Sequence, residues 1–212
     1  MIILFFKGKF IMDFIKYVEK EKKKARIKNV EEVRKDIDKE WVKEKINKYL
    51  EEMDYAISYE EVRQSILTNF VSASHFMKPP GKQNISEKLC AQILNLKKLP
   101  PSGNNCIRFN DAGDIVHTAS GGNTKSADFY YKEYYMTQKY TNESGGSQDN
   151  QRNDVIDFLK RGSIKHKVGA IVDGYYWEKY RPILKDMFKN NPNVLITSVT
   201  EITENDNLCK NK

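Results

Sequence analysis

The chain has 212 residues, of which 31% are charged, and a formal net charge of +7. This length fits one domain, or one domain with a helical extension, and the basic surplus favours a polyanionic partner such as nucleic acid. The three cysteines, Cys90, Cys106 and Cys209, are far apart and form no C-x-x-C pair, which argues against a zinc site or a disulfide framework.

The N-terminal apolar run covers only residues 1–6 before Lys7 interrupts it. It is too short to span a bilayer and lacks the features of a signal peptide, so we expect a cytoplasmic protein with no membrane attachment. Met12 offers an alternative start, which would place residues 1–11 outside the native protein.

The first part of the chain has helical periodicity. Apolar residues recur at steps of three and four through residues 29–53, which predicts one charged helix with a single apolar stripe. Ser58 and Glu61 then form a capping-box pattern, and the helix that they begin is expected to continue through Phe70 and Val71. A short helix follows at about residues 86–94. These elements predict an N-terminal helical segment over residues 1–100.

After Pro100-Pro101 the periodicity changes to that of strands, so residues 101–212 are expected to form the sheet-containing core. The predicted order is β-β-β-β-α-β-α-β. The elements are strands at 106–109, 115–118, 127–131 and 134–140, a helix at 148–160, a strand at 168–172, a helix near Pro182 with Ile183, Leu184, Met187 and Phe188 inward, and a strand at 194–199. The fold class is therefore α/β (α+β), a mixed β-sheet flanked by helices, with the whole chain as one compact domain.

The second predicted hairpin brings three polar side chains together. If its turn is centred between Lys132 and Glu133, Asp128 faces Thr137, and Lys139 lies on the same face two residues further on. An aspartate with a second oxygen ligand can hold magnesium, and a lysine beside them can assist an attacking water. An ordinary Asp–Lys salt bridge between neighbouring strands is the alternative interpretation.

This arrangement resembles the PD-(D/E)XK nuclease superfamily, in particular type II restriction endonucleases. Asp128 matches the aspartate that begins the hairpin, Thr137 the acidic position and Lys139 the lysine, while Ser126-Ala127 replaces the proline of the motif. The hairpin and the helix and strand after it extend the resemblance over roughly residues 127–199. It implies a Mg²⁺-dependent endonuclease that cuts double-stranded DNA at a specific sequence, acts as a homodimer and is paired with a cognate DNA methyltransferase.

Thr137 departs from the family pattern, because a hydroxyl is a weaker metal ligand than a carboxylate. Three alternatives stay open. Glu133 or Glu143 supplies the second carboxylate, Gln138 is the functional residue after a local bulge, or the site is inactive. In the last case the chain is a catalytically inactive nuclease-like module that binds nucleic acid or a protein through its basic helices.

The loop after Lys139 is a second candidate region. Ser147 can cap a helix whose N-terminus favours phosphate, and the glycines before it allow a backbone to approach closely. Amide side chains can pair with adenine edges. The predicted DNA-binding residues are Gly145, Gly146, Ser147, Gln148, Asn150 and Gln151.

Overall fold

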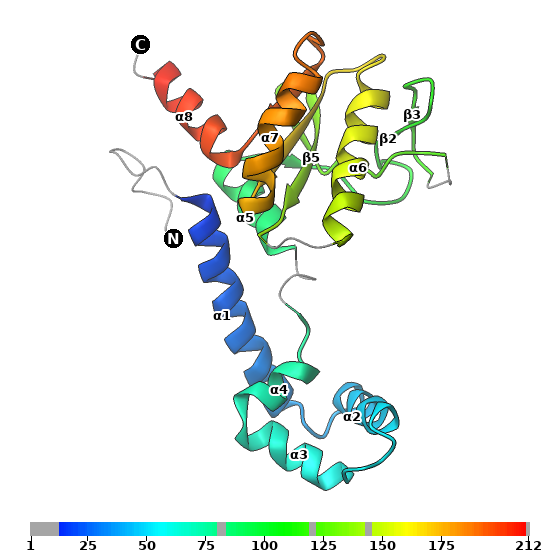
Figure 1. Ribbon diagram of the computed structural model, residues 1–212, viewed down its shortest axis with the longest axis vertical. Helices are drawn as coiled ribbons and strands as arrows, with labels where there is room; N and C mark the ends of the chain where they lie inside the picture. The colour runs from blue at the N-terminus through cyan, green and yellow to red at the C-terminus, as the bar shows by residue number, and fades with distance from the viewer. Residues whose placement is uncertain (1–12, 80–83, 119–121, 143–145, 211–212) are drawn as a thin grey trace. The chain divides into compact units, whose positions relative to one another are not determined.

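The structure is a computed structural model that describes residues 13–79, 84–118, 122–142 and 146–210. It divides the chain into two units (Figure 1). The helical unit comprises Val18–Ile85, and the sheet unit comprises Met1–Tyr17 with Ser86–Lys212. Among the described residues, no helix combines the length and apolar character that a bilayer crossing requires.

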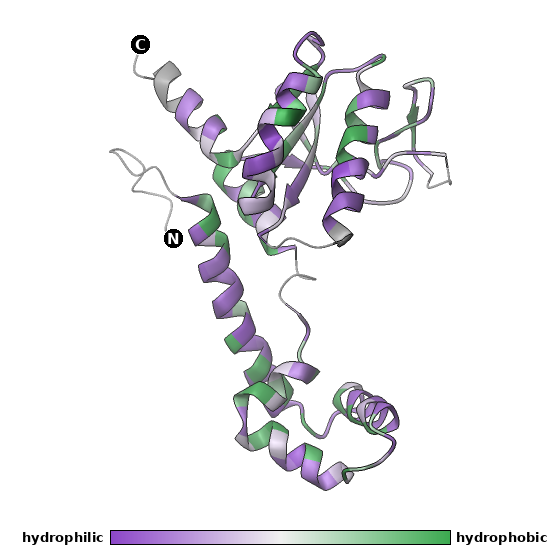
Figure 2. Ribbon diagram, in the orientation of Figure 1, coloured by the Kyte–Doolittle hydropathy of each residue, from purple (hydrophilic) through white to green (hydrophobic). Residues whose placement is uncertain are grey.

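Four helices form or enter the helical unit: α1 (Phe14–Lys35), α2 (Glu40–Glu52), α3 (Tyr59–Thr68) and α4 (Phe70–Phe76). Their apolar stripes meet in one core that includes Val33, Ile46, Ile66 and Phe76. Figure 2 shows green, hydrophobic residues gathered where the end of α1 meets α4. Each stripe covers one face of a short helix, so the unit is stable only when these faces bury one another.

The prediction of one continuous helix over residues 29–53 is wrong, because α1 ends at Lys35 and α2 begins at Glu40. The turn between them is held locally by Asp36. Its carboxylate pairs with Lys39 at 2.9 Å and accepts a hydrogen bond from Trp41 Nε1 at 3.2 Å. The apolar periodicity runs through the break because both helices contribute to the same core.

The predicted capping box is confirmed, since Ser58 Oγ accepts the N–H of Glu61 and the Glu61 carboxylate accepts the N–H of Ser58. The predicted continuation through Phe70 and Val71 is wrong. Asn69 ends α3 and caps α4, which leaves Phe70 42% and Val71 64% exposed.

The sheet unit contains the remaining elements, and their order from residue 106 to residue 197 is the predicted one. They are α5 (Ile85–Leu94), β1 (Lys97–Lys98), β2 (Arg108–Phe109), β3 (Ile115–Val116), β4 (Phe129–Tyr131), β5 (Tyr134–Tyr140), α6 (Gly146–Gly162), β6 (Val168–Asp173), α7 (Tyr175–Met187), β7 (Val194–Thr197) and α8 (Val199–Lys210). The main sheet has the order β1-β4-β5-β6-β7, and β2 and β3 form a separate hairpin. Strands β1, β4 and β5 are antiparallel, whereas β5, β6 and β7 are parallel, so the predicted mixed sheet is present.

The sequence pattern places the end of the helical segment at residue 100, whereas the structure places the boundary between its two compact units after Ile85. Helix α5 belongs with the sheet because it buries Leu89 and Cys90, and because β1 directly after it pairs with β4. Helix α8 and the two-residue strand β1 were not predicted.

Strand β6 is fully buried, as its continuous apolar sequence predicts. One of its faces carries Ala170 and Val172, which pack against residues of α6 and α7, including Phe158 and Trp177. Figure 1 shows these two helices side by side along strand β5.

The expected inward face of α7 is wrong in part. The helix begins at Tyr175, seven residues before Pro182, and its buried residues are Trp177 and Leu184. Those two residues are two helical turns apart and therefore lie on the same face, which is the buried one. Ile183 and Met187 lie off that face and are about half exposed. The last strand ends at Thr197 and not at residue 199, because Val199 begins α8.

Candidate functional site

The candidate site lies where β4 separates from β5. The turn at Lys132-Glu133 pairs Tyr131 with Tyr134, and Phe129 with Met136, which is the predicted register. Lys132 adopts a positive φ of 55°, as tight two-residue turns often require. Because the register is fixed here, the next residue back, Asp128, is placed beside the middle of β5.

The backbone pairing changes at Asp128. Its N–H donates to Met136 O at 2.8 Å, so the regular ladder shifts there by one residue, as in a β-bulge. Oδ2 of the Asp128 carboxylate then takes the place of a strand carbonyl, accepting the Gln138 N–H at 2.7 Å and the Thr137 hydroxyl at 3.2 Å. The predicted meeting of Asp128 and Thr137 is therefore present. Among the described residues, Oδ1 of the same carboxylate accepts no hydrogen bond.

Thr137 and Lys139 lie on the face of the sheet that α6 and α7 cover. Their parallel partners on β6 are Ala170 and Val172, and residues paired across adjacent strands share a face. Thr137 is buried, whereas Lys139 is partly exposed. Its ammonium acts electrostatically on Asp128 without a hydrogen bond between the two, so the three predicted residues do come together.

The protonation of Asp128 reflects opposing influences. Burial raises the pKa of this carboxyl above its ordinary value, and the negative charge of Glu87 adds to the increase. The Lys139 ammonium and the hydrogen bonds from Gln138 and Thr137 oppose it. A cation bound at the carboxylate would favour the charged form in the same way as Lys139 does.

Glu87 is the site residue that the sequence did not reveal. It lies on α5, pairs with Lys98 of β1 at 2.5 Å, and is close enough to Asp128 to influence its pKa. The sequence analysis placed Glu87 in the helical segment, and no local pattern linked this residue to the hairpin that contains Asp128. The apolar spacing around Glu87 indicates only an amphipathic helix.

The other residues considered in place of Thr137 are Glu133, Glu143 and Gln138. Glu133 lies in the hairpin turn and pairs with Lys167 at 2.6 Å. It stands four positions before Thr137, about 13 Å along the strand at roughly 3.3 Å per residue, so it lies at the turn end of β5 and away from Asp128. Glu143 lies outside the described residues. Gln138 contributes its backbone N–H to Asp128, while its side-chain Nε2 is buried and without a hydrogen-bond partner in the described part of the chain.

Only part of the predicted DNA-binding loop lies within the described residues. Gly145 lies outside the described residues, and α6 begins at Gly146, so Ser147 stands in the first turn of the helix. Gln148 is buried and Asn150 is exposed. Gln151 accepts a hydrogen bond from the Thr141 hydroxyl at 3.0 Å, which ties α6 to the end of β5.

Magnesium requires hard oxygen ligands and commonly takes one or two carboxylates, with waters and substrate phosphates completing the shell. Asp128 with its unengaged Oδ1 and the Thr137 hydroxyl fit such a sparse site, and Glu87 is a second carboxylate whose charge acts on Asp128. They do not make a dense one, since the described residues contain no group of three or more His, Cys, Asp or Glu side chains placed to hold a metal ion.

Comparison with known proteins identified no relative of this chain. No protein-family model, no curated protein and no solved structure matches this chain.

Proposed function

We propose that the chain is a Mg²⁺-dependent endonuclease of the type II restriction class that hydrolyses phosphodiester bonds of double-stranded DNA. The observation that carries the proposal is the position of the Asp128 carboxylate. It lies in the gap where two strands separate, bonded to the Thr137 hydroxyl and within the electrostatic influence of Lys139 and Glu87. Charged groups gathered at one point of an otherwise apolar sheet are typical of a functional site.

In this proposal Asp128 holds the metal through Oδ1, and Thr137 and Glu87 contribute directly or through water. A magnesium ion at that place would polarise a phosphoryl oxygen and acidify a bound water. Lys139 orients the attacking water and offsets the negative charge that develops on the phosphate. The bond from the Gln138 N–H fixes the direction of the Asp128 carboxylate before substrate arrives.

The formal net charge of +7 supports a polyanionic substrate such as DNA. A homodimer would match a two-fold symmetric DNA site, and a cognate methyltransferase would protect host DNA. Both partners are part of the proposal.

Cleavage of long duplex DNAs of mixed sequence, with magnesium and with an EDTA control, tests this function. Asp128→Asn keeps an acceptor for the Gln138 N–H, and Lys139→Met keeps the length of the side chain. Each variant should lower cleavage by about 100-fold or more, which is typical for loss of one group that stabilises transition-state charge.

Lys167→Met is the matched control, because it removes one lysine charge from the same unit at a residue paired with Glu133. It should cleave within about twofold of the natural chain. Natural rates in Asp128→Asn or in Lys139→Met would refute the assignment.

The second candidate is a catalytically inactive nuclease-like module that binds nucleic acid or protein. Thr137 at the acidic position of the motif favours it, together with the sparse set of acids around Asp128. DNA binding without cleavage by the natural chain, at any magnesium concentration, would select this alternative.

A further inference from the structure

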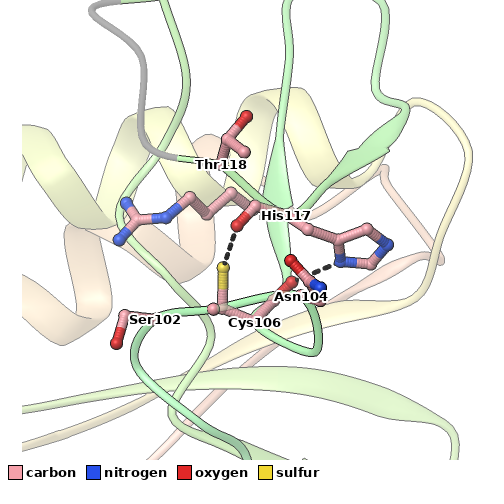
Figure 3. Close-up of a pocket in the computed structure, with 7 residues that line it drawn as sticks. Ser102, Asn104, Cys106, His117 and Thr118 are labelled. Carbon is pink, nitrogen blue, oxygen red and sulfur yellow. Dashed lines mark hydrogen bonds between the residues drawn. The ribbon is translucent and has the colours of Figure 1, made fainter.

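A pocket of about 260 Å³ lies beside the β2–β3 hairpin, and its described lining includes none of the residues assigned above. The loop before β2 forms one wall, and the segment that leaves β3 forms the other. Figure 3 shows Ser102 and Cys106 facing Thr118 and His117 across it. The described residues that line it are Ser102, Gly103, Asn104, Cys106, Arg108, His117 and Thr118.

The two walls are locked to each other by a reciprocal pair of hydrogen bonds. The Cys106 thiol donates to His117 O at 2.7 Å, and His117 Nδ1 lies 2.7 Å from Cys106 O. Because a carbonyl oxygen only accepts, Nδ1 carries the proton and Nε2 is the ring nitrogen left for another partner. The pocket is thus formed before any ligand binds.

Arg108 gives the pocket its charge. Its guanidinium donates from Nη1 to Thr124 O at 2.9 Å and from Nη2 to Pro101 O at 3.3 Å, while its Nε is buried without a partner. Both acceptors are neutral carbonyls, and no carboxylate among the described residues forms an ion pair with Arg108. A partly buried cation without a counter-ion is costly, so an anion beside it is favoured.

The rest of the lining suits an oxyanion. It contains the hydroxyls of Ser102 and Thr118 and the amide of Asn104, and no acid is among the described residues that line it. Guanidinium groups bind phosphate in a bidentate geometry, and the hydroxyls and the amide of the lining are further hydrogen-bond donors. The volume is below the roughly 300–1,000 Å³ of sites for drug-sized ligands, which fits one phosphoryl group with the rest of its molecule outside.

We propose that this pocket binds a phosphoryl group, held by Arg108 and by the side chains of Ser102, Asn104 and Thr118. The site is distinct from Asp128 but shares its framework, because Ile107 O accepts the N–H of Ala127, directly before Asp128. The phosphate comes either from a free phosphate or mononucleotide or from the backbone of a nucleic-acid strand. The binding does not depend on cleavage at Asp128.

The test uses the full chain in EDTA, so that the proposed cleavage cannot contribute. Only three histidines are present, and the His117 ring signal in a proton–carbon NMR spectrum is therefore readily assigned. The chain is titrated separately with inorganic phosphate, with thymidine 5′-monophosphate and with a short DNA duplex. The His117 signal should shift saturably with at least one of them.

Arg108→Gln should weaken this binding by about tenfold or more, since a hydrogen-bonded charge is lost. The double variant Ser102→Ala with Asn104→Ala changes only exposed side chains, so it tests the site even if Arg108→Gln fails to fold. It should weaken binding by about threefold or more. Lys167→Gln, which removes a charge elsewhere in the sheet unit, should change it less than about twofold.

A shift with phosphate or mononucleotide alone identifies a small-molecule source, and a shift with duplex DNA only identifies a strand phosphate. The proposal is overturned if no probe moves the His117 signal, or if the double variant binds all three probes as the natural chain does. Loss of cleavage in Asp128→Asn with this binding intact would separate the two sites.

Discussion

Asp128 shows how one carboxylate combines a structural and a chemical role. Oδ2 satisfies the Gln138 N–H that β4 leaves unpaired when it separates from β5, whereas Oδ1 has no hydrogen-bond partner among the described residues. Loss of a buried acceptor typically costs 1–3 kcal/mol, so a change to alanine would disturb the strand as well as the proposed chemistry. An asparagine separates these effects because its amide oxygen still accepts the N–H.

Thr137 provides the sharpest test at the level of one residue. A glutamate there would add a carboxylate beside Asp128, so Thr137→Glu should lower the magnesium concentration needed for cleavage. Thr137→Val keeps the β-branched shape but deletes the oxygen, and it should raise that concentration. The measurement is cleavage rate against magnesium for the three proteins.

Coincident magnesium curves would place Thr137 outside the metal's ligand shell and leave Glu87 as the better second ligand. Cleavage by Thr137→Glu alone would show that the natural chain is an inactive relative.

Asp173 is a buried acid at the end of β6. Both of its carboxylate oxygens lie 3.3 Å from the Val199 N–H at the start of α8. Burial raises its pKa to about 7, and the charges of Glu201 and Glu178 add to this, while the Val199 N–H and Arg181 oppose it. The folded chain therefore holds a proton that the unfolded chain releases near pH 4.

The pH dependence of stability follows from this difference. The contribution of protonated Asp173 is full below about pH 4 and is lost as the pH rises to about 7, by up to about 1.4 kcal/mol per pH unit. Asp173→Asn stays neutral and keeps an acceptor for Val199, so its stability relative to the natural chain should increase between pH 5 and pH 8. Urea unfolding at the two pH values measures the change. Asp186→Asn, at an exposed ion pair, is the control and should show no such trend.

At the level of elements, local capping decides where the helices begin and end. Ser58 starts α3 through a capping box, and Asn69 ends α3 while accepting the first N–H groups of α4. These bonds span at most four residues, so they form without tertiary contacts. Helix ends of this kind are therefore set by side-chain identity more than by the core.

Replacement of the cap should be measurable. Ser58→Ala removes the acceptor of the Glu61 N–H and the partner of the Glu61 carboxylate, and should destabilise the helical unit by about 1 kcal/mol. Ser58→Asn retains a capping oxygen and should cost a few tenths of a kcal/mol. Equal unfolding free energies for the two variants, measured in urea, would show that the box contributes nothing.

At the level of the whole molecule, the described residues form two hydrophobic cores. One lies in the helical unit around Ile46, with Trp41 packed against it, and the other lies in the sheet unit around Leu184 and Trp177. Since the chain has only two tryptophans, each core carries its own fluorescence probe. The cores share no residue, which favours separate unfolding of the units.

Single-tryptophan variants test this separation. In the variant that keeps only Trp41, Ile46→Ala should lower the stability by about 2–5 kcal/mol, the usual effect of such a cavity. The same substitution in the variant that keeps only Trp177 should leave the unfolding midpoint unchanged. Leu184→Ala should give the reverse pattern. Equal shifts of both probes would show one cooperative unit.

The sequence alone determined the features that depend on local pattern. Alternation of side chains and the turn at Lys132-Glu133 set the register of the β4–β5 hairpin, which brought Asp128 to Thr137. The capping box at Ser58 and the buried strand over Val168–Asp173 were equally predictable. In each case the causes are a turn, a cap or a period within a few consecutive residues.

Only the tertiary structure decided the relations between distant segments. It placed Glu87 of α5 near Asp128, assigned α5 to the sheet unit, and divided the chain at residue 85. It also set the buried face of α7, where Ile183 and Met187 are exposed although both are apolar. Periodicity shows that a helix has an apolar face, but packing against a partner, chosen by shape and burial over the whole chain, determines which residues that face includes.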